Sequence, residues 1–323
     1  MSKKIIFSGG GTGGHIFPAI NLMKHFFDKE YKVLLVTDNR GNNLVKNYSE
    51  FKSYILRAGT PTNKNLFQKF FSYFLIFYSM IRSIIILKNE KPDLIFGFGG
   101  YVSFPISFVS RFFNLPLIIY ENNMVLGRAN KYLSSFSKKI LLAKRVTKNF
   151  SEKYKNKTYE VGSILNKNII NYSPFKENEN EGKFSILVLG GSQGAEIFGT
   201  IIPTVIKMIK DAGYEIKINQ QCIIEQKNSI IDFYEKNNIK NYVFEFDKNI
   251  LKLISSSSLA ITRCGASTTA ELAHTLTPFI AVPLPNSIDN HQYLNAKYYE
   301  NKGCCWLLEQ DNFNSENLFN LII

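Results

Sequence analysis

The chain has 323 residues, 45% of them hydrophobic, so it is long enough and apolar enough for two ordinary domains with full cores. Its four cysteines form no CxxC pair and no metal-ligand spacing, which argues against a disulfide scaffold and a zinc site. We recognise no signal peptide, since the apolar stretch near the amino terminus is short and runs into glycines, and we therefore expect a cytoplasmic protein.

The net charge of +13 is distributed unevenly along the chain. Residues 1–163 carry 25 Lys and Arg against 9 Asp and Glu, whereas residues 164–323 carry 14 against 17. The basic half suggests an anionic partner, which could be nucleic acid, an anionic lipid surface or a diphosphate. Compositional drift is the alternative, although drift would affect both halves alike.

A glycine-rich turn follows the first predicted strand, Lys4–Ser8, and leads into a helix that we expect to begin near Pro18. The turn contains the GxGxxG spacing, and a second predicted strand over Val33–Thr37 ends at Asp38. Because dinucleotide-binding proteins place a ribose-binding acid there, an NAD enzyme is one interpretation. His15, just after the last glycine, is not required by such a turn and indicates a base or a phosphate partner.

Residues 66–87 form the most apolar part of the chain and are nearly long enough to span a bilayer. Gln68, Lys69 and Arg82 interrupt the apolar run, and two lysines follow it. We favour a packed helix that leads to the next strand. The alternatives are an aromatic surface with basic flanks that rests on a membrane and, least favoured, a membrane-spanning helix.

Three further strands are predicted in the first half, over 93–96, 115–120 and 140–143. The sequence GFGGYVS follows the first of them, and Glu121-Asn122-Asn123 follow the second. Side-chain amides at the carboxyl end of a strand lie where open α/β sheets bind ligands, although ordinary polar loop residues are the alternative. Residues 163–183 are polar and are predicted to link two domains.

The opening pattern recurs after this linker, because a predicted strand over Phe184–Leu189 is again followed by a glycine turn and a helix. The repetition predicts two similar α/β halves. The second turn also spells G-x-S-x-G, which would make Ser192 the nucleophile of a hydrolase. Asp289 and His291 are its only neat partners, and a spacing of two residues is poor for a relay that must reach a distant serine.

The stretch 263–271, RCGASTTAE, follows an apolar strand over Leu259–Thr262 and leads into another helix. Gly265 permits a sharp turn, and we expect Ser267 and Thr268 to cap the helix, whose first N–H groups would then bind a phosphate. Glu271 would reach a ribose, where a carboxylate can accept from two hydroxyls. A capped helix with a surface glutamate is the alternative. The remaining strands are predicted over 216–219, 242–246 and 279–283.

Taken together, these motifs resemble the MurG family, bacterial transferases that add GlcNAc from UDP-GlcNAc to undecaprenyl-diphosphate-linked MurNAc-pentapeptide. The matching stretches lie in order across nearly the whole chain: GGGTGGHIFPAI at 9–20, GFGGYVSFP at 97–105, YENNMVLGRANKYL at 120–133, LGGSQGA at 189–195, RCGASTTAEL at 263–272 and PNSIDNHQYLNA at 285–296.

The resemblance implies an α/β fold of the GT-B type, with two Rossmann-like domains whose parallel sheets face each other across a cleft. Residues 1–163 would bind the acceptor and an anionic membrane surface, and residues 164–323 would bind UDP-GlcNAc. The implied enzyme is peripheral on the cytoplasmic face of the cell membrane, converts lipid I to lipid II with inversion, and has no nucleic-acid partner. It holds no metal or tightly bound cofactor, although a divalent cation would assist through the UDP diphosphate.

Carried over residue by residue, the resemblance makes His15 the candidate base. The implied substrate-binding residues are Thr12, Gly13, Gly14, Asn123, Ser192, Ala266, Ser267, Thr268, Thr269, Ala270, Glu271 and Gln292.

Three features depart from the family pattern. An arginine expected shortly after Gly162 is missing, with only Lys167 to replace it, and the usual pair of glutamines is His291-Gln292 here. The chain also ends about one helix early. These departures leave three alternatives: a glycolipid glycosyltransferase of the same fold, a UDP-GlcNAc epimerase, and a non-catalytic membrane-associated homologue.

Overall fold

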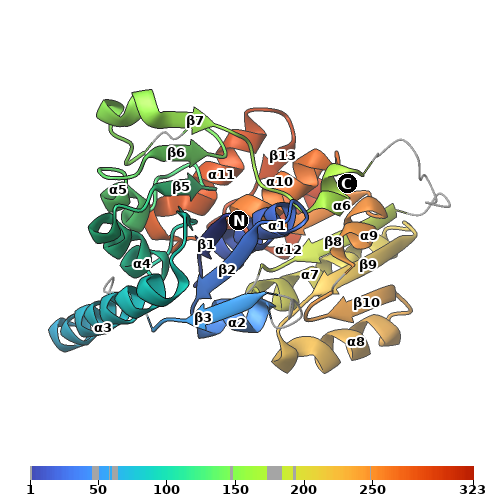
Figure 1. Cartoon of the computed structure of the whole chain (residues 1–323). Helices are drawn as coiled ribbons and strands as arrows, with labels where there is room; N and C mark the ends of the chain where they lie inside the picture. Colours follow the sequence, from blue (N-terminus) through green and yellow to red (C-terminus); the bar gives the residue numbers. More distant parts are fainter. Residues whose placement is uncertain are drawn as a thin grey trace. The chain divides into compact units, whose positions relative to one another are not determined.

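The computed structural model describes residues 2–45, 51–57, 59, 65–145, 148–172, 184–191, 194–247 and 249–323. The chain divides into two compact units, Met1–Asn166 and Lys167–Ile323, and each unit contains one parallel sheet with its connecting helices (Figure 1). The prediction of two similar α/β halves is therefore confirmed.

The first unit contains a seven-stranded parallel sheet in the order β3-β2-β1-β4-β5-β6-β7. Its strands are β1 Lys4–Ser8, β2 Lys32–Thr37, β3 Lys52–Ile55, β4 Leu94–Gly97, β5 Leu117–Glu121, β6 Lys139–Leu142 and β7 Thr158–Glu160. Its helices are α1 Gly13–Phe27, α2 Asn39–Val45, α3 Leu66–Glu90, α4 Ser103–Val109 and α5 Arg128–Leu133, with short 3-10 helices η1 Ser110–Phe113 and η2 Glu152–Lys157. The strand order reverses between β1 and β4, which is where sheets of this kind bind ligands.

Burial on both faces explains why the strands of this sheet are continuous apolar runs. Successive side chains of a strand point to opposite faces, so Ile5 and Phe7 pack with Ile16 of α1 on one side. Ile6 packs on the other side, in the cluster that contains Ile106 of α4.

The second unit contains a six-stranded parallel sheet in the order β10-β9-β8-β11-β12-β13, which reverses between β8 and β11. The strands are β8 Phe184–Leu189, β9 Ile216–Gln221, β10 Lys240–Phe244, β11 Leu259–Thr262, β12 Phe279–Ala281 and β13 Cys305–Leu307. The helices are α6 Lys167–Ile170, α7 Glu196–Asp211, α8 Lys227–Lys236, α9 Ile250–Ser255, α10 Ala266–His274, α11 His291–Glu300 and α12 Ser315–Ile322, with η3 Ile224–Gln226, η4 Ile288–Asn290 and η5 Gln310–Asn312.

Some boundaries differ from those predicted. Helix α1 begins at Gly13, so Pro18 lies inside the helix and the expectation that it opens the first turn is wrong. Strands β3, β7 and β13 were not predicted, because each has only three or four residues with partly exposed side chains.

Helix α3 is confirmed as a helix, but the favoured interpretation of a packed helix is wrong for most of its length. Its polarity is the reverse of that of a helix in water. Its buried face includes Ser72, Ser79 and Ser83, whose hydroxyls donate to backbone carbonyls. Its exposed face carries large apolar side chains, among them Leu66, 87% exposed, and Phe70, 74% exposed. By length and composition α3 could cross a membrane. Only 28% of its most apolar window is buried, whereas the core helix of a soluble protein would be mostly buried.

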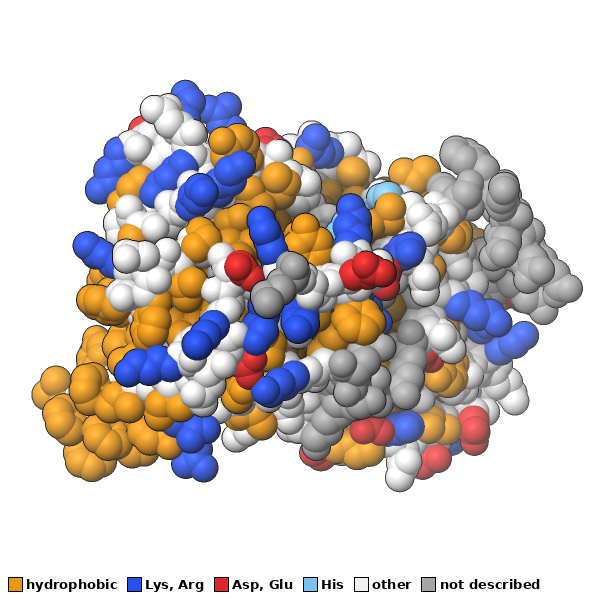
Figure 2. All heavy atoms as spheres, in the orientation of Figure 1, with side chains coloured by type: hydrophobic (Ala, Val, Ile, Leu, Met, Phe, Trp, Pro, Cys, Tyr) orange, Lys and Arg blue, Asp and Glu red, His pale blue; other side chains and the backbone are white. Residues whose placement is uncertain are grey.

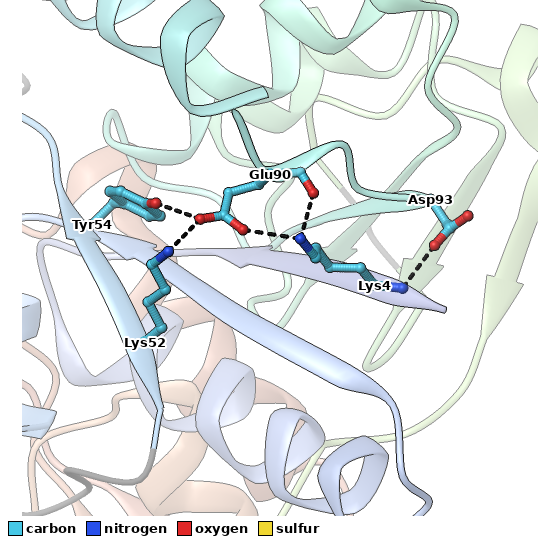
Figure 3. A network of polar contacts seen from close by, with 5 residues as sticks. All are labelled: Lys4, Lys52, Tyr54, Glu90 and Asp93. Atoms are coloured by element: carbon cyan, nitrogen blue, oxygen red, sulfur yellow. Dashed lines mark hydrogen bonds and ion pairs between the residues drawn. The ribbon is translucent and has the colours of Figure 1, made fainter. Parts of the chain in front are cut away.

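The carboxyl end of α3 is held to the sheet by the buried carboxylate of Glu90 (Figure 3). Glu90 accepts hydrogen bonds from Lys52 Nζ at 2.6 Å, from the Tyr54 hydroxyl and from Lys4 Nζ at 3.0 Å. The backbone N–H of Lys4 in turn donates to Asp93 Oδ2 at 2.7 Å. Mainly because of the bonds from Lys52 and Tyr54, the pKa of Glu90 falls from 4.5 to about 2.

We predict that Glu90→Gln lowers the free energy of unfolding of the first unit by about 2–3 kcal/mol at neutral pH. A carboxyl group with a depressed folded pKa stabilises the fold above its unfolded pKa, and this contribution is lost as the pH falls through the folded value. The difference from the wild type should therefore shrink as the pH falls from 4.5 towards 2 in urea denaturation. The exposed Glu152→Gln is the matched control, and an equal effect of both substitutions would contradict the prediction.

Candidate functional site

The glycine turns after β1 and β4 lie where the strand order of the first sheet reverses. Gly99 and Gly100 have φ values of +83° and +78°, in the region that favours glycine. A side-chain carbon on Gly99 would lie 3.2 Å from Cε1 of His15, and one on Gly100 would lie 3.4 Å from Cδ2. The two glycines therefore leave the space into which the half-buried imidazole of His15 packs.

The amino-terminal end of α1 is formed by Thr12, the exposed N-cap residue, and by Gly13 and Gly14. Pro18 has no N–H to donate to the carbonyl oxygen of Gly14, four residues earlier. Asn122, which follows β5, supplies a donor instead, because its Nδ2 lies 3.4 Å from that oxygen. The loop after β5 is thus tied to the glycine turn.

Glu121, 1% exposed, organises the rest of this loop. Its Oε1 accepts the backbone N–H and the side-chain amide of Asn123, both at 3.1 Å. Its Oε2 accepts the N–H of Gly127 at 2.9 Å and Nδ2 of Asn130 at 3.0 Å. The amide nitrogen of Asn123 is therefore directed at Glu121, and its carbonyl oxygen faces away from the carboxylate.

Tyr120 holds the stretch that begins at Gly162. Its hydroxyl lies 3.2 Å from the carbonyl oxygen of Gly162 and accepts the N–H of Ile164 at 3.1 Å. Burial raises the pKa of Tyr120, so the hydroxyl stays neutral.

Asp38, which suggested a dinucleotide-binding enzyme, bonds to the backbone. Its Oδ1 accepts the N–H of Gly41 at 2.7 Å and that of Gly11 at 3.2 Å. The carboxylate therefore connects α2 with the glycine turn, a structural role that accounts for an acid at the end of β2 without a ribose.

In the second unit, the first turn of α10 lies at the carboxyl end of β11. The N-cap residue is Gly265, so the expectation that Ser267 and Thr268 cap this helix is wrong, and both lie within its first turn. Thr269 donates its hydroxyl back to the carbonyl oxygen of Gly265 at 3.1 Å. Because the first N–H groups of a helix have no acceptor within it, this end can still attract an anion.

Two side chains of α11 hold the backbone of Cys264, just before α10. Gln292 Oε1 accepts the N–H of Cys264 at 3.1 Å and that of Leu284 at 3.0 Å. Asn295, 1% exposed, donates from Nδ2 to the carbonyl oxygen of Cys264 at 3.1 Å. Both acceptor contacts of Gln292 are made by its oxygen, so its NH₂ group is the part that can donate to a substrate.

Arg263 holds the loop that follows β12. Its Nη1 donates to the carbonyl oxygens of Val282 and Pro283, both at 3.2 Å, and its Nη2 donates to Gln310 Oε1 at 2.5 Å. The guanidinium group also lies over the ring of Phe198. These partners are all neutral, and burial lowers the pKa of Arg263.

Three candidate positions on α10 are more enclosed than a surface helix would make them. Ala266 and Ala270 are buried. Glu271 is half-buried, and burial raises its pKa from 4.5 to about 7. A carboxyl group with such a pKa changes charge near neutral pH, which is more typical of functional sites than of surface glutamates.

Ser192 lies outside the described residues, so the structure does not test its prediction. Of its two suggested partners in a hydrolase, His291 has Nδ1 2.8 Å from the carbonyl oxygen of Ile288 in its own loop. Asp289 lies in η4 with a φ of +52°.

Sequence reasoning assigned no role to Glu121, Asn130, Arg263 or Asn295. Glu121 and Asn130 carried a usable signal, because an acid that ends an apolar strand needs buried donors and an asparagine follows nine residues later. Arg263 and Asn295 carried none, since most of their partners are backbone carbonyl groups and the others lie far away in the sequence.

The comparisons with known proteins agree with this geometry. The glycosyltransferase family 28 N-terminal domain matches residues 5–142, and the C-terminal domain of the same family matches residues 185–322. A protein of Pelagibacter ubique is 36% identical over 324 residues, which cover 100% of this chain and 89% of the relative. A protein of Rickettsia canadensis is 37% identical over 323 residues, which cover 99% and 90%. Both are named UDP-N-acetylglucosamine–N-acetylmuramyl-(pentapeptide) pyrophosphoryl-undecaprenol N-acetylglucosamine transferase.

Among solved structures, MurG of Acinetobacter baumannii matches with a TM-score of 0.74 and 26% identity, covering 99% of this chain and 90% of that one. A UDP-N-acetylglucosamine 2-epimerase of Listeria monocytogenes matches with a TM-score of 0.64 at 13% identity, which indicates a common fold alone. The predicted GT-B fold and the predicted enzyme class are confirmed.

We predict that Gln292→Met lowers the free energy of unfolding of the second unit by about 1–3 kcal/mol, because two backbone N–H groups lose their acceptor. Gln292→Glu keeps a side-chain oxygen and is the matched control, with a smaller loss. The chain contains one tryptophan, Trp306 in β13, so its fluorescence during urea denaturation reports on this unit. Equal stability of the methionine variant and the wild type would show that these contacts are not structural.

Proposed function

The chain belongs to glycosyltransferase family 28, and from this premise we propose that it transfers GlcNAc from UDP-GlcNAc to the 4-hydroxyl of MurNAc in undecaprenyl-diphosphate-linked MurNAc-pentapeptide, converting lipid I to lipid II. The observation that carries the proposal is the identity of 36–37% over nearly the full chain with relatives named for this transfer.

In this proposal the second unit binds the donor nucleotide-sugar. The amino-terminal turn of α10, from Ala266 to Ala270, holds the phosphates, since helix N–H groups and the helix dipole attract anions. Glu271 accepts hydrogen bonds from the ribose hydroxyls. Gln292 donates from its NH₂ group to a GlcNAc hydroxyl, because its oxygen is held by backbone N–H groups.

The first unit supplies the base and the acceptor site. The oxygen of the MurNAc 4-hydroxyl attacks C1 of GlcNAc from the face opposite the nucleotide, and the C1–O bond to the β-phosphate breaks, which inverts the anomeric centre. His15 takes the hydroxyl proton, and UDP leaves with the electron pair. Thr12, Gly13 and Gly14 line the region of the diphosphate and sugar, and Asn123 contacts the sugar.

A divalent cation enters this scheme only with the substrate. Developing negative charge on the leaving diphosphate is stabilised by the amino-terminal end of α10, so the protein itself needs no resident metal. Mg²⁺ would then act as a partner of UDP.

The acceptor lipid requires a membrane surface, and we propose that α3 provides the contact. Figure 2 shows its apolar side chains gathered at one end of the molecule, with Lys and Arg side chains nearby. Lys69, Arg82 and Lys88 lie on α3 itself, where Glu90 is the only acid. Aromatic and basic residues of this kind favour the interface of an anionic cytoplasmic leaflet.

The contacts of α3 favour a helix that lies on the membrane over one that spans it. Spanning would pull Ile86 and Leu87 out of the core and would break the hydrogen bonds of Glu90. The protein is thus proposed to be peripheral on the cytoplasmic face.

The first test is release of UDP from UDP-GlcNAc with and without a soluble lipid I analogue. We predict release that depends on the analogue and yields the disaccharide product. Addition of EDTA should raise KM for UDP-GlcNAc without abolishing transfer. Release without the acceptor analogue would favour a hydrolase, and conversion of the donor to another UDP-sugar without release would favour an epimerase. Donor binding with neither outcome would favour another acceptor or a non-catalytic protein.

We also predict that UDP-GlcNAc binds more tightly as the pH rises. Glu271 has a pKa raised to about 7, and only its ionised form accepts from both ribose hydroxyls, so affinity should increase from pH 5.5 and level off above about pH 8. Isothermal titration across this range measures the effect. Glu271→Gln should bind more weakly and lose this pH dependence, and an unchanged pH profile in the variant would exclude Glu271 as its source.

For the membrane contact, Phe70→Glu combined with Phe74→Glu should weaken binding to anionic phospholipid vesicles at least about tenfold, since charges replace exposed aromatic side chains. Transfer to a soluble acceptor analogue should be unaffected. Tyr214→Glu, at a residue 52% exposed in the second unit, is the control for added negative charge. Vesicle sedimentation measures the binding, and equal loss in both variants would argue against α3 as the contact.

A further inference from the structure

Arg263 is the first residue after β11, at the point where the strand order of the second sheet reverses. Its backbone N–H donates at 3.0 Å to the carbonyl oxygen of Leu189, the last residue of β8. Gly265, the N-cap of α10, follows two residues later, and two residues of chain span at most about 7 Å. Arg263 therefore lies beside the end of α10 that the proposed function assigns to the phosphates.

The guanidinium group of Arg263 is enclosed by three further segments. Its Nη1 donates to the carbonyl oxygens of Val282 and Pro283, in the loop after β12. Its Nη2 donates to Gln310 Oε1 in η5. Its Cζ lies 5.0 Å from the centre of the ring of Phe198, in the first turn of α7. The amino-terminal end of α7 is thus a second positive helix end near this side chain.

No carboxylate among the described residues balances the charge of Arg263. The residue is 8% exposed, and all the partners of its guanidinium group are neutral. Glu196, Glu309 and Asp311 are close in sequence to these partners, but all three are exposed, and in the part of the chain that the structure describes none of them forms an ion pair with Arg263. Burial lowers the pKa of Arg263, and no carboxylate offsets this effect. A buried charge without an opposite charge is costly, which indicates that an anion uses it.

We propose that Arg263 is the fixed positive charge of the donor site and that the diphosphate of UDP is the anion that balances it. Neutral acceptors hold the two terminal nitrogens of the guanidinium group, so the charge acts through space, in an enclosed setting where charges interact more strongly than in water. Together with the amino-terminal end of α10, it stabilises the negative charge that the diphosphate gains as the C1–O bond breaks.

The inference rests on the proposed function for the identity of the donor, and it makes a separate prediction about binding. Uridine carries no charge at neutral pH, whereas both phosphates of UDP are charged. At a separation of about 10 Å and an effective dielectric constant of about 20, one pair of unit charges changes a Kd about tenfold. Arg263 should therefore strengthen the binding of UDP and leave that of uridine unchanged.

The sharpest test changes the charge without changing Arg263. Gln310→Glu keeps the shape of the side chain, and its carboxylate accepts from Nη2 where Oε1 does now, so an ion pair cancels the field of the guanidinium group. We expect this variant to bind UDP at least about tenfold more weakly than the wild type, with its affinity for uridine within about twofold. Isothermal titration measures UDP directly and uridine by displacement of UDP. The melting temperature should not fall, because an ion pair replaces a neutral contact.

Gln310→Met is the matched control, because it removes the same contact and leaves the charge. Its ratio of UDP to uridine affinity should equal that of the wild type. Arg263→Lys keeps the charge and should retain most of this ratio, whereas Arg263→Met should lose it. With a soluble acceptor analogue, kcat should fall in Gln310→Glu and stay unchanged in Gln310→Met.

Equal weakening of UDP and uridine in Gln310→Glu would show that the contact supports only the loop, and wild-type affinity for UDP in this variant would show that the charge is not felt. Either result would overturn the inference, as would a changed ratio in Gln310→Met. A wild type that binds UDP in this charge-dependent way but transfers nothing would refute the proposed function and leave the inference standing. A wild type that binds neither ligand would overturn both.

Discussion

Two parallel sheets, each buried on both faces, impose the constraint on which the candidate site depends. Every strand of such a sheet ends at the same edge, and the strand order reverses once, between β1 and β4 in the first unit and between β8 and β11 in the second. Loops on either side of a reversal leave in opposite directions, which opens space for a ligand. His15 follows β1 and the amino-terminal turn of α10 follows β11, so each lies at the reversal of its own sheet.

Most of the polar side chains at these sheet edges form hydrogen bonds that hold the loops, so part of each sequence motif has a structural role. Asn122 donates to the carbonyl oxygen that Pro18 leaves without a helical donor, and Glu121 accepts four hydrogen bonds from its own loop and α5. Gln292 joins the backbones of two loops through a single oxygen. A loop held in this way presents its remaining polar atoms in one orientation before substrate arrives, which reduces the cost of ordering them on binding.

The two ends of helix α3 differ in their surroundings. Its carboxyl end belongs to the folded core, where Glu90 accepts from residues that begin β1 and β3, at the edge of the sheet opposite the glycine turns. Most of its remaining length exposes aromatic side chains while burying serines. A helix with this inverted polarity is stable next to a bilayer, where the aromatic groups leave water, and the ionic anchor keeps it in the domain.

The sequence by itself determined the two α/β halves, most strand positions and the family, because apolar runs and glycine turns are local patterns that backbone geometry requires. It also predicted which segments would gather at the strand ends. It did not predict that Gly265 is the N-cap of α10, that Asp38 bonds to backbone, or that Gly99 lies beside both Asn130 and His15. Those features depend on contacts between residues far apart in the chain, and hydrogen bonds from side chains to backbone leave no pattern in the residue types. Only the tertiary structure decides them, since it alone determines which donor meets which acceptor.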